Sequence, residues 1–454
     1  MMKKIFSIGM LFAVTAIALT GCKNEEDDLF SSSAAERLSE SQKIYTERLG
    51  GTTWVMEYYP LDYTELDPET RNPYPNGLGY VILNRFNADG SVEQAMNNAA
   101  SGNRYVYDTS LWEVIADQGP VLSFNSFNKC IHTFADPGIN DPWENLYQGR
   151  GYEGDYEFNV INLESDAEFA MLKGKKRGTY VRMSKLPNDT DFETYLQDIN
   201  NFKAMLFNNS PNNCFMSLGD TTFVFTKGDR YMAEIYPVDG DAISENSDHV
   251  YTITKRDGQY YLRFREKIGR GNCDAQEFVY NAQDETFYDV ENSEYTIQGY
   301  PVGKFYNEYQ QSNKWTTRTD ASMSDAFKSA MDAVSADLLA VNRNYVFSNI
   351  NFGYDAKTQK YLWTLRYLSS GRNATAVYYF NFQCNEGDDT CTFSYIEPSD
   401  VAAQNVMNRC PAEQNMWNLL SQEWILSAAD TKFNLTRIKL TSKTNPDIWF
   451  VMNI

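Results

Sequence analysis

Histidine, cysteine and carboxylate side chains carry most acid–base and nucleophilic chemistry in proteins. This chain has only two histidines, His132 and His249, beside 61 acidic residues. His132 stands in KCIHTF, an alternating stretch that predicts a strand with Cys130, His132 and Phe134 on one face. A cysteine and a histidine at this spacing could act as nucleophile and base, but no known catalytic motif surrounds them. The shortage of imidazole also argues against zinc or iron, so we expect no metal and no other cofactor.

Carboxylates are the second group that could do chemistry. Glu153, Asp155 and Glu157 alternate, which predicts that they share one face of a strand. A calcium site or a catalytic pair is conceivable there, but a solvated strand face explains the pattern more simply. Glycosidases need two carboxylates at a fixed separation, and no pair among the acidic residues is singled out by its position. An extracytoplasmic hydrolase that uses carboxylates is therefore the alternative function.

Two glycine-containing motifs have simple structural interpretations. GRGYEG (149–154) matches a dinucleotide-binding pattern, but that motif must be followed by a helix, and here a predicted strand follows. KGKKRG (173–178) predicts a charged turn between two strands. Both segments are expected to be loops.

The composition argues against nucleic acid as a partner. Without Lys3 and Lys4 of the leader described below, 38 basic residues stand against 61 acidic ones, a net charge of about −23. Binding of nucleic acid depends on basic surfaces. The aromatic content is 15%, with 31 tyrosines, which is typical of β-rich proteins and of sugar-binding surfaces.

Three aromatic residues outside the predicted strands are the candidate ligand-binding residues. Trp143 and Tyr147 lie in DPWENLYQGRGY, and Tyr74 lies in RNPYPNG. Long loops rich in proline and glycine often carry binding residues, and exposed rings stack on sugars or anchor protein partners. The partner would be a glycan, a peptide or an outer-membrane transport complex. The alternative is that these rings cap the open end of a barrel.

The cysteine content permits disulfides. Six cysteines remain besides Cys22, and Cys384 and Cys391 flank the turn-rich NEGDDT, so these two are the pair that we expect to bond. The alternative is that all six are buried free thiols.

The N-terminus predicts export and lipidation. Lys3 and Lys4 precede a short apolar run, and Leu19-Thr20-Gly21-Cys22 resembles a bacterial lipobox. The resemblance implies a signal peptide over 1–21, a diacylglycerol on Cys22 and attachment to the outer membrane through lipid. The acidic segment 22–32 is then a solvated tether. Its KNEEDD resembles the signal that sends lipoproteins to the cell surface; the periplasmic face is the alternative.

The remaining chain predicts a mainly β fold of antiparallel barrel- or sandwich-like, lipocalin-like modules with a few packing helices. Apolar residues at helical spacing predict helices over 33–49, 323–342 and 411–420. A further helix is predicted within 186–209, where Pro187 ends a strand and Thr190 and Glu193 form a capping box. Short aromatic and β-branched runs between them predict strands, and the Asp-Gly pairs in NADGS and KRDGQ predict tight hairpins. We expect three modules, over 33–187, 188–318 and 319–454.

Four segments of the chain together resemble a family of Bacteroidota lipoproteins known only as a domain of unknown function. These segments are SSSAAERLSES, TWVMEYYP, FNADGSV and SLWEVIADQGPVLSFNSFNKCIHTFADP. The closing NLTRIKLTSKTNPDIWFVM fits the same family. The resemblance covers nearly the whole mature chain. Members of the family are often encoded near SusC/SusD-type uptake systems, and the resemblance supplies no established activity and no catalytic residues to carry over. A non-catalytic binding or accessory module on the cell surface is the function that we expect.

Overall fold

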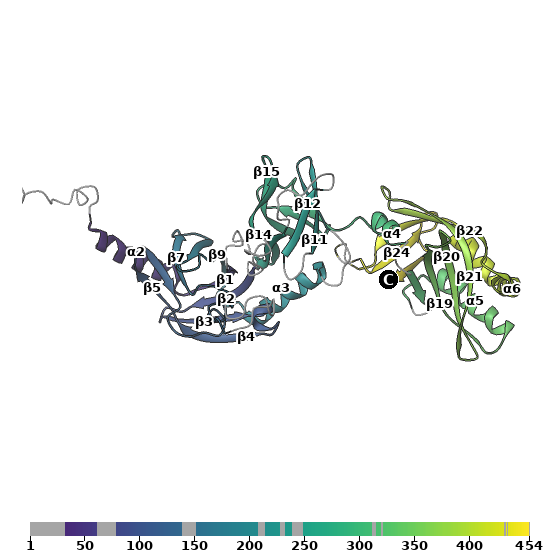
Figure 1. The fold of residues 1–454 in the computed structure, drawn as a ribbon, viewed down its shortest axis with the longest axis horizontal. Coiled ribbons are helices and arrows are strands. Elements are labelled where there is room, and N and C mark those ends of the chain that lie inside the picture. Colours follow the sequence, from purple (N-terminus) through teal and green to yellow (C-terminus); the bar gives the residue numbers. More distant parts are fainter. Residues whose placement is uncertain are drawn as a thin grey trace, which may run out of the picture. The chain divides into compact units, whose positions relative to one another are not determined.

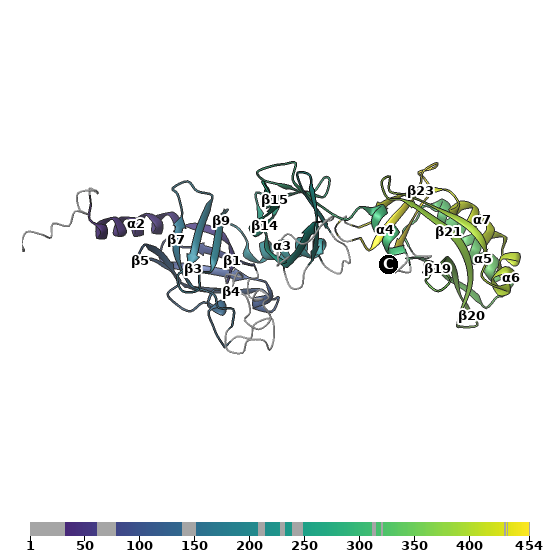
Figure 2. The same ribbon diagram turned by 45° about the horizontal axis from the view of Figure 1, so that its top comes forward.

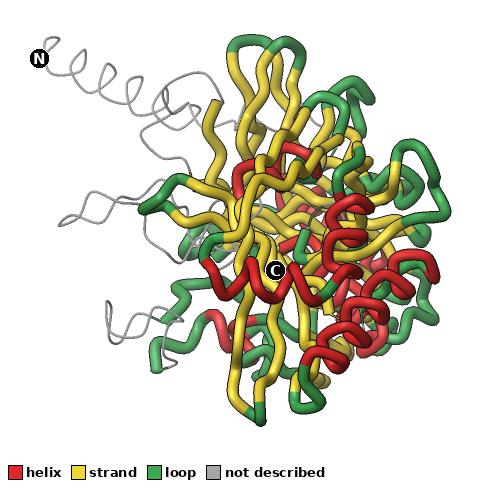
Figure 3. Tube along the Cα trace, turned by 90° about the vertical axis from the view of Figure 1, so that its right-hand side faces the viewer, coloured by secondary structure: helices red, strands yellow, loops and turns green. Residues whose placement is uncertain are grey.

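The structure is a computed structural model of the 454-residue chain. It describes residues 32–60, 79–138, 151–207, 214–227, 232–237, 248–310, 315–318, 321–430, 433 and 435–453. These residues form two compact units, the first ending at Phe192 and the second beginning at Glu193. Strands outweigh helices throughout (Figure 3), which confirms the predicted mainly β, antiparallel fold.

The first unit is a nine-stranded antiparallel sheet with one helix (Figure 1). The strand order is β4-β3-β2-β1-β9-β8-β7-β6-β5. The two edge strands β4 and β5 are joined by the single residue Trp112, so the sheet curls until its edges come together there. The strands are β1 (Thr52–Tyr59), β2 (Tyr80–Phe86), β3 (Ser91–Met96), β4 (Val106–Leu111), β5 (Glu113–Ala116), β6 (Pro120–Ser123), β7 (Glu157–Asn162), β8 (Phe169–Gly174) and β9 (Tyr180–Leu186), and short 3₁₀ turns η2 (Ala99–Ser101) and η3 (His132–Phe134) lie between them.

Helix α2 (Ala34–Leu49) begins at the capping box that its sequence predicts. Ser33 Oγ accepts the Glu36 N–H, and the Glu36 carboxylate accepts the Ser33 N–H. Gly50 ends the helix, and Gly51 follows with φ +73°, a conformation that favours glycine. Helix α2 packs against β5 and β6, and its last residue, Leu49, is buried.

The second unit begins with α3 (Phe192–Phe207) and a closed barrel of eight sequential antiparallel strands, here named the first barrel. Its strands are β10 (Cys214–Leu218), β11 (Thr221–Lys227), β12 (Met232–Pro237), β13 (Asp248–Arg256), β14 (Gln259–Arg270), β15 (Cys273–Asn281), β16 (Thr286–Asp289) and β17 (Thr296–Gln298). The β13–β14 turn is the predicted Asp-Gly hairpin: Asp257 and Gly258 have φ of +50° and +80°.

A second closed barrel follows, named the second barrel, with strands β18 (Trp315–Arg318), β19 (Tyr345–Asp355), β20 (Lys360–Ser369), β21 (Arg372–Asn385), β22 (Thr390–Pro398), β23 (Glu423–Ala428), β24 (Arg437–Ser442) and β25 (Trp449–Asn453). Its helices are α4 (Val302–Gln310), α5 (Asp325–Val341), α6 (Val401–Arg409) and α7 (Pro411–Leu420). Helices α5, α6 and α7 pack on one another beside β21 and β22 (Figure 2). A continuous aromatic core that includes Trp315, Trp363, Trp417 and Trp424 fills this part of the chain.

Both barrels have the sequential, up-and-down strand order of lipocalin-like proteins. None of the helices in the described part of the chain is long and apolar enough to span a membrane.

Candidate functional site

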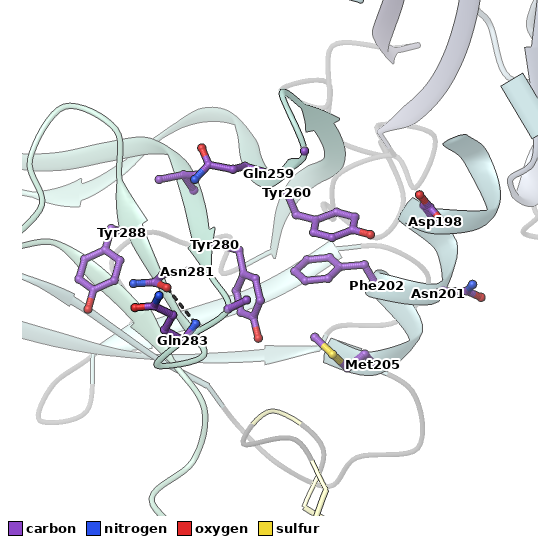
Figure 4. A pocket seen from close by; sticks show the side chains of 13 residues that line it. Asp198, Asn201, Phe202, Met205, Gln259, Tyr260, Tyr280, Asn281, Gln283 and Tyr288 are labelled. Carbon is purple, nitrogen blue, oxygen red and sulfur yellow. Dashed lines mark hydrogen bonds between the residues drawn. The ribbon is translucent and has the colours of Figure 1, made fainter. Parts of the chain in front are cut away.

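A cavity of about 990 Å³ opens beside the first barrel and is the best candidate for a binding site (Figure 4). Helix α3 and the hairpin turns β13–β14 and β15–β16 supply its walls. Its lining residues are Asp198, Asn201, Phe202, Met205, Gly258, Gln259, Tyr260, Val279, Tyr280, Asn281, Ala282, Gln283 and Tyr288. A volume of this size accommodates a small-molecule or oligosaccharide ligand.

Stacked aromatic rings form one wall of the cavity. The rings of Phe202 and Tyr260 lie parallel, with centroids 4.0 Å apart and an interplanar angle of 2°. Tyr280 meets Phe202 edge-on at 4.9 Å and 70°, as Figure 4 shows. Phe202 belongs to the apolar stripe predicted for α3 and is buried, whereas both tyrosines are half-buried. The helix therefore fixes the rings, and the barrel hairpins complete the wall.

An ion pair and a tyrosine fasten α3 to the β13–β14 hairpin. Lys255 Nζ donates to Asp198 Oδ2 over 2.6 Å, and this hydrogen bond is the main cause that raises the pKa of Lys255. Tyr195 Oη accepts the Lys255 N–H at 2.8 Å and donates to the Lys255 carbonyl at 2.9 Å. The Asp198 carboxylate in the wall is therefore paired, and the wall is held by both side-chain and backbone contacts.

Neutral polar groups make up the rim. The side chains of Asn201, Gln259 and Gln283 are exposed, and Asn281 Oδ1 accepts the Gln283 N–H at 2.9 Å (Figure 4). Tyr288 donates its hydroxyl proton to Asp284 at 2.6 Å. Amides offer both donors and acceptors. Beside aromatic rings they suit a ligand that presents hydroxyl groups and apolar ring faces.

The described lining does not present a pair of free carboxylates. Asp198 is the single carboxylate among the described residues that line the cavity, and Lys255 pairs with it. Burial, with the Glu285 and Asp284 carboxylates, raises the pKa of Tyr280 to about 12, so its hydroxyl stays protonated near neutral pH. The site can bind and orient a ligand, but it does not hold the two free carboxylates that a glycosidase uses.

The structure contradicts the strand predicted for KCIHTF. His132–Phe134 form the 3₁₀ turn η3. The Cys130 thiol donates to the Val106 carbonyl at 3.7 Å, whereas His132 Nδ1 accepts the Asn128 N–H at 3.1 Å. Burial raises the pKa of Cys130 to about 12. A buried, protonated thiol with its own acceptor is not an activated nucleophile.

The second histidine, His249, is half-buried. Burial lowers the pKa of His249 to about 4, so its imidazole is neutral at neutral pH. Within the described part of the chain, no three His, Cys, Asp or Glu side chains come together as a group that could hold a metal ion.

The shared strand face predicted for Glu153, Asp155 and Glu157 is also wrong. Strand β7 begins only at Glu157, and Glu153 and Asp155 before it are buried instead of solvated. Asp155 accepts the backbone N–H groups of Lys176, Arg177 and Thr179. It thereby organises the KGKKRG segment, which is a turn between β8 and β9 as predicted.

The predicted binding and lipidation residues lie outside the described residues. These residues are Trp143, Tyr147 and Tyr74 for binding and Cys22 for lipidation. Cys384 and Cys391 are described: they lie directly opposite each other on β21 and β22, and both are free thiols in the structure. Their pairing as a disulfide stays a prediction.

The cavity could not be predicted from the sequence, because its lining residues come from three separated segments. The stripe on α3 indicated that Phe202 is buried, and Asp257-Gly258 indicated a hairpin, but neither pattern shows that the two meet. The useful signal was the concentration of tyrosines and amides around turns, in GQYY and VYNAQ.

Comparison with solved structures gives only distant similarity. A double mutant of Transferrin Binding Protein B from Haemophilus parasuis aligns over 88% of this chain and 74% of its own, with 8% identity and a TM-score of 0.17. The DNA polymerase III subunit beta from Pseudomonas aeruginosa aligns over 92% and 97%, with 8% identity and a TM-score of 0.13. Similarities this weak carry no argument about fold or function.

No curated protein sequence matches the chain. A family model described as "Domain of unknown function (DUF4302)" matches residues 26–282, which is more than half of the sequence and includes every residue that lines the cavity except Gln283 and Tyr288. The chain therefore belongs to the DUF4302 family, a family of proteins that share this domain of unknown function.

Proposed function

We propose that this protein is a lipid-anchored outer-membrane protein that binds a glycan in the cavity of the first barrel and does not cleave it. The observation that carries the proposal is the lining of that cavity: tyrosine rings beside four neutral amides, with its one carboxylate already paired. Sugars expose apolar ring faces and neutral hydroxyl groups, which fit rings and amides respectively.

Three features of the sequence support the location and the context. The lipobox at Cys22 supports lipid attachment, and KNEEDD supports exposure on the cell surface. The resemblance to Bacteroidota lipoproteins encoded near SusC/SusD-type uptake systems supports a role beside an outer-membrane transporter. An accessory protein of this kind would hold glycans at the surface for uptake.

The alternative, a carboxylate-based hydrolase, is less well supported. It needs two free carboxylates, whereas the described lining holds only Asp198, which is paired with Lys255. Incubation of the protein with any glycan that it binds separates the two functions, since a hydrolase releases shorter products and a binding module returns the glycan intact.

Binding is tested with a glycan array and titration calorimetry on the full-length protein in detergent. Asn201→Ala and Gln283→Ala each remove one exposed amide from the rim. Each should weaken binding about five- to tenfold, the loss expected for one or two hydrogen bonds. Asp220→Ala is the matched control, because Asp220 is exposed in the β10–β11 turn of the same barrel and does not line the cavity.

The proposal fails if the array shows binding that both rim variants retain at full strength. It also fails if the folded wild-type protein binds none of the glycans.

A further inference from the structure

Strands β21 and β22 place two cysteines directly opposite each other. The register pairs Gln383 with Thr392, Cys384 with Cys391, and Asn385 with Thr390. Directly opposite residues of an antiparallel pair point to the same face, and their Cα atoms are about 4.5–5.5 Å apart. A disulfide requires a Cα separation of about 4.4–6.8 Å. The backbone is therefore already arranged for a bond between these two sulfurs.

The other described cysteines have no such partner. On the strands, Cys214 lies opposite Phe225 and Cys273 lies opposite Arg270. Cys130 lies in the first unit, and Cys410 lies between α6 and α7. Cross-strand geometry thus distinguishes one pair among the six thiols.

The cysteine pair lies where the β21–β22 hairpin holds the start of α4. The Cys384 thiol contacts the Gly303 carbonyl at 3.4 Å, and Asp389 Oδ1 accepts the Gly303 N–H at 2.7 Å. Asn307, one turn further along α4, donates to Glu386 at 2.7 Å. The hairpin and the start of α4 are therefore joined by three hydrogen bonds close to the two sulfurs. A disulfide would remove the bond that the Cys384 thiol donates, and the bonds that Asp389 and Glu386 accept would remain.

We propose that Cys384 and Cys391 are joined by a cross-strand disulfide when the protein meets an oxidising disulfide, such as a protein disulfide oxidase or oxidised glutathione. The Cys384 thiolate attacks the disulfide of the oxidant, releases one thiol from it and forms a mixed disulfide. The Cys391 thiolate then displaces the second thiol of the oxidant. One Sγ–Sγ bond forms, the two cysteines lose two protons and two electrons, and the oxidant's disulfide is reduced to two thiols.

Burial determines the order and the speed of these steps. Cys391 is buried and Cys384 is half-buried, so the oxidant reaches Cys384 first. Burial raises the pKa of Cys384 to about 12 and also raises that of Cys391. Only thiolates attack disulfides. The uncatalysed reaction should therefore be slow at neutral pH and speed up about tenfold for each unit of pH.

The test is a peptide map of the full-length protein after treatment with oxidised glutathione at pH 8, followed by denaturation and alkylation of the remaining thiols. We expect one link, between Cys384 and Cys391, and a loss of about 2 Da from the intact mass for the two hydrogens removed. Cys384→Ser should abolish the link, and Cys214→Ser, which also removes a thiol from a barrel strand, should leave it in place.

A thermal melt checks the folding of the variants and gives a second readout. The oxidised wild type should melt a few degrees above the reduced protein, because the link restricts the unfolded chain, and Cys384→Ser should show no such difference. The proposal is overturned if both cysteines are still alkylated after the folded wild type has been treated with oxidised glutathione and then denatured. It is also overturned if glutathione stays on Cys384 without reaching Cys391, or if Cys384 links to another cysteine.

Discussion

Glu413 is a carboxyl group buried without a charged partner in the second barrel. Its side chain has no exposed surface, and among the described residues neither carboxyl oxygen has a hydrogen bond of ordinary geometry. The nearby Tyr378 hydroxyl offsets only part of the effect of burial on the pKa of Glu413. Burial raises its pKa to about 8 from an ordinary value of 4.5. The folded protein therefore keeps a proton on Glu413 at neutral pH, whereas the unfolded chain releases it.

This difference makes stability depend on pH in a definite direction. Below pH 4.5 the carboxyl is protonated in both states, and its contribution is fully present. Between pH 4.5 and about 8 the free energy of unfolding falls by about 1.4 kcal/mol per pH unit, because only the unfolded chain ionises. The total loss is on the order of 5 kcal/mol.

Glu413→Gln should remove this pH dependence. The amide has nearly the same shape and cannot ionise, so the variant should be more stable than the wild type at pH 8 and similar to it at pH 5. Urea unfolding followed by tryptophan fluorescence measures the effect. Five of the eight tryptophans, Trp315, Trp363, Trp417, Trp424 and Trp449, belong to the second barrel and report mainly on it.

Glu423→Gln is the control for this measurement. Glu423 lies on β23 of the same barrel, is partly exposed and pairs with Lys443 at 2.6 Å. Its replacement should leave the pH dependence intact. Equal slopes between pH 5 and pH 8 for the wild type and Glu413→Gln would show that Glu413 is not the titrating group.

Helices and hairpin turns that are marked by residues within their own segment were predicted from the sequence. The predicted helix over 33–49 is α2, that over 323–342 contains α5, and the patch at 411–420 is α7. Each has a cap or a proline at its start and a continuous apolar stripe. The Asp-Gly hairpins were also predicted, because few other residues adopt positive φ readily.

Elements that depend on distant contacts were missed or misassigned. Helix α4 and helix α6 are short, and their helical patterns were not recognised. KCIHTF alternates like a strand, yet Asn128 and His132 hold it as a turn through side-chain bonds to the backbone. Such local bonds override an alternating pattern, because they satisfy the backbone without a neighbouring strand.

The Tyr195 hydroxyl should stabilise the contact between α3 and the β13–β14 hairpin. Tyr195→Phe removes the hydroxyl that accepts the Lys255 N–H and donates to its carbonyl. The variant should lose about 1–2 kcal/mol of stability, and the Lys255 amide should exchange its hydrogen faster. Hydrogen–deuterium exchange measures this, with the buried Leu262 of β14 as an internal control. Unchanged exchange at Lys255 would show that the hydroxyl does not hold the helix to the hairpin.

At the scale of the whole molecule, the class of fold was predictable but the closure of its sheets was not. Each barrel closes through its first and last strands, β10 with β17 and β18 with β25. Alternating apolar residues predict which face of a strand is buried, but they do not determine which distant strand lies beside it. Barrels and sandwiches therefore stayed open alternatives until the pairing was known.

The same limit applies to the cavity. Its walls combine a helix with two hairpins whose residues lie between positions 198 and 288. A motif search detects residues at fixed spacing, whereas this lining is brought together by closure of the barrel. The loop aromatics nominated from the sequence, Trp143, Tyr147 and Tyr74, were chosen because they lie in long loops outside the predicted strands. They stay separate candidates.

The last prediction concerns attachment of the whole molecule to the membrane. In the proposed function, lipid on Cys22 is the anchor, and the acidic segment that follows keeps the folded units away from the bilayer. Cys22→Ser removes the acceptor thiol, so the protein should lose lipid labelling and either appear in the soluble fraction or retain its signal peptide. Metabolic labelling with a fatty-acid analogue, followed by fractionation, measures both outcomes. Lys23→Ala is the control, because it changes the neighbouring residue and leaves the thiol in place. If Cys22→Ser is labelled and fractionates like the wild type, Cys22 is not the anchor, and the surface location proposed for the glycan-binding cavity loses its main support.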